Sequence, residues 1–259
     1  VNKDNDSTVA WMWHANGGTT SANTDGSGAT LASTIQANQD AGFSIVSYTG
    51  NNTAGAKIAH GLGAAPHWII VKDRDNSSYE WMVYHHRNTT APETDYLQLS
   101  ATDATSDLNT IWNDTAPTSS VFTVGNNGSV NANAVKYIAY CWTEIAGYSK
   151  FGSYLGNGNS NGALVITGFK PAWLMIKDVD NSRNWITIDN ARDPFNPTDK
   201  GLASSNTNAE NTGNAIDFLS NGFKFRSSST SFNTSAAYIY MAFAEHPFLG
   251  DGTNPATAR

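Results

Sequence analysis

The chain has 259 residues, a net charge of −7 and a pI near 5.2, and only 14% of its residues are charged. No cluster of lysine and arginine is present, which argues against nucleic acid and anionic membrane surfaces as partners. No run approaches eighteen apolar residues, which argues against membrane insertion. The single cysteine, Cys141, can form no disulfide within the chain and is expected to be a buried apolar side chain.

The first fifteen residues repeat the pattern of a later segment. Val9–Trp13 aligns without a gap on Ile138–Trp142. We therefore interpret residues 1–15 as the last strand of a preceding, truncated unit. A lone strand cannot bury its own faces, so we expect residues 8–14 to pair with a sheet of a later unit or with another chain.

Residues 16–41 are rich in Gly, Thr, Asn and Ser, a composition typical of a linker. Within this linker, residues 30–37 have the composition of a short strand. We expect the rest of the segment to join residues 1–15 to the first complete unit.

Residues 42–146 carry seven strand signals separated by turn residues. The expected strands cover residues 43–48, 57–60, 68–72, 80–85, 96–99, 121–124 and 136–142. No segment shows a sustained 3.6-residue apolar period with helix caps, so helix is limited to a turn or two. The sequence predicts a first β-sandwich unit over this range.

One motif occurs twice. Pro66–Ser77 returns 105 residues later as Pro171–Ser182, and seven of the twelve positions are identical. Self-similarity of this kind indicates an internal duplication. We therefore expect a second unit of the same fold at residues 147–249 and a C-terminal tail at 250–259. Residues 191–205, with two prolines and scattered charge, are expected to be a long loop.

The last strand of each unit is apolar on both faces. In the first unit the alternate residues are Ile138, Tyr140 and Trp142 on one face, and Tyr137, Ala139 and Cys141 on the other. Two apolar faces predict a central strand covered on both sides, by the core on one and by a neighbouring unit or subunit on the other. We therefore predict an all-β fold of two tandem, duplicated antiparallel β-sandwiches of jelly-roll or lectin-like type.

Motifs typical of enzymes are absent. The chain has no nucleophile elbow, zinc-protease pair, phosphate-binding loop or dinucleotide fingerprint. The carboxylates open to a hydrolase interpretation are Glu80, Glu93, Asp95, Glu144 and Glu245, and nothing in the sequence selects a pair of them. We therefore expect neither a catalytic site nor a cofactor.

Alternating carboxylates in the repeated motif have two interpretations. Asp73 and Asp75, like Asp178 and Asp180, precede Asn and Ser and offer the oxygen ligands that Ca²⁺ prefers. Against a Ca²⁺ site, the glycine and glutamate of a calcium loop are missing, and Asp, Asn and Ser favour hairpin turns by bonding their own backbone. A plain turn is the favoured interpretation.

Aromatic residues beside polar ones give the candidate ligand site. An exposed ring can pack on the apolar face of a sugar while amide and carboxylate groups bind the hydroxyls. The candidates are Trp81, Tyr84, His85, Trp112, Asn113, Asp114 and Trp185. Because Trp81 and Trp185 are repeated, the competing interpretation is that both are core residues.

Several segments resemble a known family. They are residues 42–51, 60–66, 115–125, 147–154, 192–197 and the ending from Pro247 to Arg259. Together they resemble a duplicated domain of unassigned function found in tail-fibre-like and lectin-like structural proteins of marine and aquatic tailed bacteriophages. The resemblance implies a virion component at or near the tail and a homo-oligomer, with a trimer expected of a fibre. It supplies no catalytic or binding residues.

Three functions follow from the sequence as expectations. The first is a distal tail-fibre or tail-tip segment that adheres to host-surface glycan. The second is a capsid decoration or packing module without a ligand, in contact with itself and other virion proteins. The third is a surface-polysaccharide hydrolase.

Overall fold

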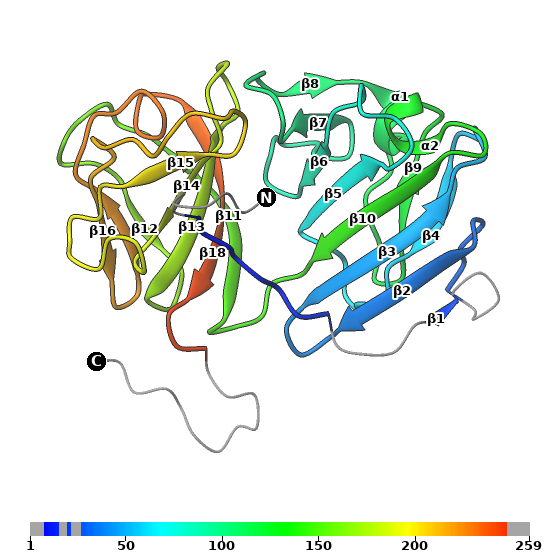
Figure 1. The fold of residues 1–259 in the computed structure, drawn as a ribbon, viewed down its shortest axis with the longest axis horizontal. Helices are drawn as coiled ribbons and strands as arrows, with labels where there is room; N and C mark the ends of the chain where they lie inside the picture. Colours follow the sequence, from blue (N-terminus) through cyan, green and yellow to red (C-terminus); the bar gives the residue numbers. More distant parts are fainter. Residues whose placement is uncertain (1–7, 16–19, 22–26, 248–259) are drawn as a thin grey trace.

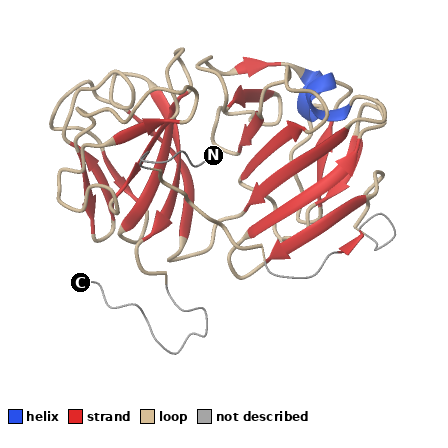
Figure 2. Cartoon of the chain, in the orientation of Figure 1, coloured by secondary structure: helices blue, strands red, loops and turns tan. Residues whose placement is uncertain are grey.

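The structure is a computed structural model that describes residues 8–15, 20–21 and 27–247. Two β units lie side by side (Figure 1), and all strand pairs within their sheets are antiparallel. In the part of the chain that the structure describes, helix is confined to two short segments of the first unit, α1 (Asn109–Trp112) and α2 (Gly128–Asn131) (Figure 2). None of the helices in these residues is long and apolar enough to cross a membrane. The all-β prediction is confirmed.

The first unit consists of an eight-stranded sheet faced by a two-stranded one. The large sheet has the order β1-β2-β3-β10-β5-β6-β7-β8, and β4 pairs with β9. The strands are β1 (Thr20–Ser21), β2 (Ser33–Asn38), β3 (Phe43–Thr49), β4 (Ala56–Ala59), β5 (Trp68–Asp73), β6 (Met82–His85), β7 (Asp95–Gln98), β8 (Ser106–Asp107), β9 (Val121–Val124) and β10 (Lys136–Trp142). All seven strands expected between residues 42 and 146 are present, with ends shifted by at most two residues.

The second unit repeats this arrangement. Its large sheet has the order β11-β18-β13-β14-β15, which matches β3-β10-β5-β6-β7, and it is faced by β12-β17-β16. The strands are β11 (Ser149–Leu155), β12 (Leu164–Ile166), β13 (Pro171–Asp178), β14 (Ile186–Asp189), β15 (Gly201–Ala203), β16 (Ile216–Leu219), β17 (Gly222–Phe225) and β18 (Ala237–Ala244). The duplicated fold is confirmed. The short β15 lies inside the segment that we expected to be entirely loop.

Each unit has a separate core between its two sheets. In the first, the rings of Tyr48 and Tyr137 stack with centroids 5.2 Å apart; in the second, Tyr154 and Tyr238 stack at 5.0 Å. Cys141 is fully buried in the first core, as expected, and burial raises the pKa of its thiol. The repeated tyrosine pair shows that the two cores are built on the same plan.

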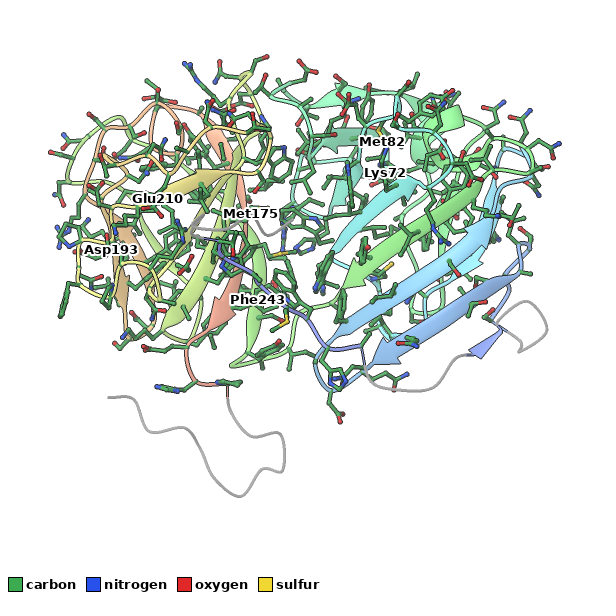
Figure 3. The ribbon with its side chains drawn as sticks, in the orientation of Figure 1. Lys72, Met82, Met175, Asp193, Glu210 and Phe243 are labelled. Atoms are coloured by element: carbon green, nitrogen blue, oxygen red, sulfur yellow. The ribbon has the colours of Figure 1, made fainter. Side chains whose placement is uncertain are left out.

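A third apolar core joins the two units. Its buried members from the outer faces of the large sheets are Phe43, Trp68, Ile70, Val83, Leu97 and Trp142 in the first unit, and Phe151, Trp173, Val179, Trp185, Ile239, Met241 and Phe243 in the second. Figure 3 shows Met175 and Phe243 on the side of the second unit that faces the first. The expectation that the second apolar face of β10 and β18 meets a neighbouring unit is confirmed.

Residues 8–15 are not a strand, which corrects the interpretation of this segment as a pairing strand. They run between the two units (Figure 1), and the edge of the Trp13 ring packs on Trp142 and Trp173 at centroid distances of 6.1 and 5.4 Å. Trp11 likewise meets Trp173 at 6.1 Å. The indole rings of this segment pack between the large sheets of the two units. Side-chain packing, rather than backbone pairing with a strand, therefore holds the segment in place.

Residues 27–38 cover one open edge of the first sandwich. β2 pairs with β3 along its whole length, and the Thr30 and Leu31 N–H groups both donate to Lys57 O on β4, at 2.9 and 3.0 Å. The short strand expected within the linker is therefore present, at Ser33–Asn38. It covers the edge of the large sheet at β3, while the residues just before it cover the edge of the small sheet at β4.

The same edge of the second sandwich has no covering strand in the described residues, and only side chains, those of Glu144 and His86, bond the backbone of Phe151 there. Only Ile145, Ala146 and Gly147 lie between Glu144 and Tyr148, and no strand in the described residues pairs with the outer side of β11 or β12. Large apolar side chains are exposed along this edge: Leu155 is 73% exposed, and Leu164 and Ile166 are each 53% exposed. The two units therefore share a fold, but only the first has a strand that covers this edge.

Candidate functional site

Most aromatic candidates are buried, which corrects the prediction that they form a sugar platform. Trp112 and Tyr84 lie in the first core with ring centroids 6.1 Å apart, and burial raises the pKa of Tyr84 to about 12. Trp185 and His85 lie on the other side of the sheet, where Trp68 contacts both at 5.8 and 4.9 Å. None of these four residues is more than 4% exposed, so their ring faces are closed to a ligand.

Trp81, Asn113 and Asp114 reach the surface, at different places. Trp81 is half-buried and stacks on Tyr140 at the margin of the third core, with centroids 6.4 Å apart. Asn113 and Asp114 follow α1 with φ of 55° and 45°, and the Asn113 N–H donates to Asn109 O to end the helix. Because the neighbouring Trp112 ring is buried, the polar groups of Asn113 and Asp114 lack the exposed ring that the predicted sugar site requires at position 112.

The repeated aspartates form turns. Asp73 Oδ1 accepts from the N–H groups of Asp75 and Asn76, at 2.8 and 2.9 Å. Asp75 Oδ2 then accepts from Lys136 N at 2.9 Å, which fixes the turn to the start of β10.

The second unit repeats these bonds. Asp178 Oδ1 accepts from Asp180 N and Asn181 N, and Asp180 Oδ2 accepts from Ala237 N at 2.7 Å. No group of three or more His, Cys, Asp or Glu able to hold a metal is found among the residues that the structure describes. Each of the four carboxylates therefore accepts at least one backbone N–H through one oxygen, while Asp73 Oδ2 is buried without a hydrogen-bond partner in the described residues.

The hydrolase candidates are also engaged in structural contacts. Glu144 forms an ion pair with Lys150 at 3.0 Å and accepts from Phe151 N on the free side of β11. Glu245 pairs with Lys170 at 2.8 Å and accepts from Asn190 Nδ2. The remaining engaged carboxylates accept from hydroxyls, Glu80 from Ser100 and Asp95 from Thr89.

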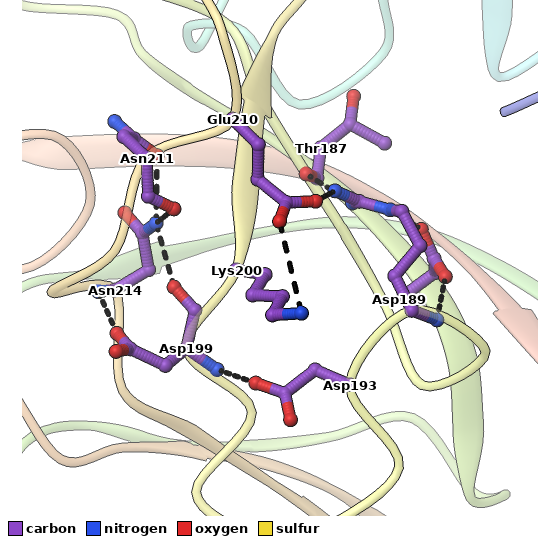
Figure 4. A network of polar contacts seen from close by, with 9 residues as sticks. Thr187, Asp189, Asp193, Asp199, Lys200, Glu210, Asn211 and Asn214 are labelled. Carbon is purple, nitrogen blue, oxygen red and sulfur yellow. Dashed lines mark hydrogen bonds and ion pairs between the residues drawn. The ribbon is translucent and has the colours of Figure 1, made fainter. Parts of the chain in front are cut away.

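A polar network in the second unit was not expected from the sequence (Figure 4). Arg192 donates to Asp189 Oδ2 at 2.6 Å and to Glu210 Oε2 at 2.5 Å, and its guanidinium lies 5.7 Å from the centre of the Trp11 ring. Asp199 accepts from Asn214 N at 2.7 Å. The network holds the long loop around β15 in place. Its sequence signal is the accumulation of acidic and amide residues between positions 189 and 214.

Three histidines meet where the units join. The rings of His67 and His86 are 4.3 Å apart, and His86 Nε2 lies 2.7 Å from Phe151 O of the other unit. Burial lowers the pKa of His85 well below its usual range and that of His86 to about 4. These rings are therefore neutral near pH 7, and His86 Nε2 donates its proton to Phe151 O.

An open groove lies on the outer face of the first large sheet, near the ends of β3 and β5. It has a volume of about 390 Å³ and is lined by Thr34, Ser47, Thr49, Arg74 and Lys136 together with their neighbours Leu31, Ala32, Ser33 and Tyr48. Arg74 and Lys136 are exposed, and the lining contains no carboxylate. Sequence analysis did not predict this groove, because its residues come from four strands or strand ends that are distant in the chain.

Comparison with known proteins gives one family. A family model described as a domain of unknown function (DUF7483) matches residues 1–247. No curated protein matches the chain, and no solved structure does. The match extends over both units and the joint between them, so the chain belongs to this family of unknown function.

Proposed function

We propose that the chain is a non-enzymatic structural component of a bacteriophage virion, placed in the distal tail fibre or tail tip, that attaches the particle to host-surface glycan. The observation that carries the proposal is the third core, which packs the two sandwiches against each other through apolar side chains of both. A distal segment that bears load during attachment needs such a joint. The resemblance of the chain to tail-fibre-like and lectin-like phage domains supports the same location.

A rigid joint is supported by polar contacts as well as by apolar burial. The Trp185 indole donates to Gln98 O, Thr105 N donates to Val179 O, and Lys177 Nζ donates to Thr102 O, at 2.8, 2.9 and 3.1 Å. These bonds have fixed directions, so they resist the sliding that an apolar contact alone would permit.

The test of attachment is an array of bacterial surface polysaccharides probed with the whole chain. We expect retention on particular polysaccharides and no shortening of any of them. Light scattering should give a mass near three chains of 27.7 kDa, as a trimeric fibre requires. A chain that is retained on no polysaccharide would contradict the attachment role.

A packing module without a ligand is the second candidate, and the uncovered edge of the second unit favours it. Leu155, Leu164 and Ile166 are exposed where the first unit has a covering segment, and a second copy of the chain could supply the missing strand. Replacing Leu164 and Ile166 with threonine should then lower the oligomer mass in light scattering. If the mass is unchanged, this edge does not mediate assembly.

A further inference from the structure

We propose that the groove on the outer face of the first large sheet binds an anionic group, a carboxylate or a sulfate, carried by a polysaccharide. This inference rests on the proposed attachment function and names its site and ligand class. The site consists of Arg74 and Lys136 with the hydroxyls of Thr34, Ser47 and Thr49.

Two cations lie together without a counter-ion. Arg74 follows β5, Lys136 begins β10, and their backbones meet where Arg74 N donates to Lys136 O at 2.8 Å. Neither side chain forms an ion pair within the described part of the chain, although the full sequence has a net charge of −7. Asp75 is beside Arg74 in sequence, but its Oδ2 is bonded to Lys136 N. An unpaired Arg and Lys form a recognition site for a carboxylate or sulfate.

The hydroxyls beside the cations point to a sugar as the carrier of the anion. Thr49 lies directly opposite Lys136, and Thr34 directly opposite Ser47, in the ladders between neighbouring strands. Alternation along each strand places these side chains on the outer face, away from the core residues Val46 and Tyr48. Hydroxyls beside two cations can bind ring hydroxyls and the acidic substituent of one sugar together.

The second unit provides an internal comparison. Val179 and Ala237 occupy the positions of Arg74 and Lys136, since Val179 N donates to Ala237 O at 3.0 Å and Asp180 Oδ2 accepts from Ala237 N. Val179 is only 5% exposed, because the first unit covers it. The fold therefore does not require cations at these two positions. They occur only in the copy where these two positions are exposed.

The test measures binding of the whole chain to polysaccharides of defined charge. The probes are polygalacturonate, which carries carboxylates, dextran sulfate, and neutral dextran as the control. We expect the wild-type chain to bind one or both acidic polymers but not dextran, with binding that weakens as salt is raised from 50 to 300 mM. The variant R74Q/K136Q should bind about tenfold more weakly, which corresponds to two exposed ion pairs.

A matched control removes two charges elsewhere. Arg87 and Arg183 are exposed and lie outside the groove, so R87Q/R183Q has the same net charge as the groove variant. It should bind like the wild type, and both variants should keep the wild-type melting temperature. Equal weakening in both variants would mean non-specific attraction and would overturn the proposal.

Two further outcomes separate this inference from the proposed attachment function. If the chain binds neutral but not acidic polysaccharides, the groove assignment fails and attachment to glycan stands. If polyglutamate binds through Arg74 and Lys136 while no polysaccharide does, the groove takes an acidic protein segment, and both the inference and the glycan attachment are overturned.

Discussion

The indole of Trp185, in the second unit, donates a hydrogen bond to the carbonyl of Gln98, in the first, at 2.8 Å. Its counterpart Trp81 stacks on Tyr140 of its own unit instead. Two residues at matching positions of a duplicated sequence thus have different partners, and this difference allows one copy to dock on the other.

The third core should make the two units unfold together. Trp68 is fully buried there, so Trp68→Ala should lower the free energy of unfolding by about 3–5 kcal/mol and separate one transition into two. Calorimetry of the whole chain measures both effects. Trp112→Ala removes a ring of equal size from the core of the first unit and should keep a single transition. Two transitions in Trp112→Ala as well would show that the joint is not the cause.

The buried lysine of the second unit should matter more than its repeated partner. Lys177 Nζ donates to Asp178 O and Arg183 O at 2.8 and 3.0 Å, and burial lowers its pKa to about 8. Lys177→Met would leave buried carbonyls without a donor and should cost about 2–4 kcal/mol in urea unfolding. Lys72→Met, at the half-exposed equivalent, should cost about 1 kcal/mol or less. Equal losses of unfolding free energy in Lys177→Met and Lys72→Met would contradict the larger role predicted for Lys177.

Acid should destabilise the fold through histidines that are buried in the neutral form. Burial lowers the pKa of His60, which is fully buried, to about 4 from its usual 6.5. The unfolded chain then binds the proton first, so the stability is fully present above pH 6.5 and falls as the pH drops toward 4, by about 3 kcal/mol for this residue. His60→Gln should reduce the slope of urea stability against pH in this window. His14→Gln, at an exposed site, is the control for the loss of a histidine side chain.

The repeated aspartates should act without a metal. Asp180 Oδ2 accepts from Ala237 N, so Asp180→Ala should lower the stability by about 1–2 kcal/mol. Because the carboxylates already bond the backbone, adding EDTA or millimolar Ca²⁺ should leave the melting temperature of the wild type unchanged. A rise in melting temperature with Ca²⁺ would restore the calcium interpretation.

The sequence predicted the strands and their duplication well, because both rest on local alternation and on an exact comparison within the chain. The alternation of residues 136–142 also predicted that both faces of β10 are covered, and the burial of Tyr137 on one face and Trp142 on the other confirms this.

Burial of the aromatic candidates could not be predicted in the same way. Trp112 follows loop residues and precedes Asn and Asp, a pattern typical of a surface, yet its ring enters the core from a single helical turn. The groove was missed for a related reason. Thr34, Arg74 and Lys136 are distant in sequence and meet only through the pairing order of the sheet.

The length of the segment that precedes a unit decides whether the edge strands of that unit are covered. A long polar leader such as residues 27–38 folds back as a cover strand, whereas the three residues before Tyr148 cannot reach across two sheets. In a longer tandem array of such sandwiches, each unit that follows its neighbour after only a few residues would have an uncovered sheet edge. Only units preceded by a longer segment would have that edge covered by a strand of their own. The length of the segments between units would then determine how many uncovered edges in the array are available to pair with another strand.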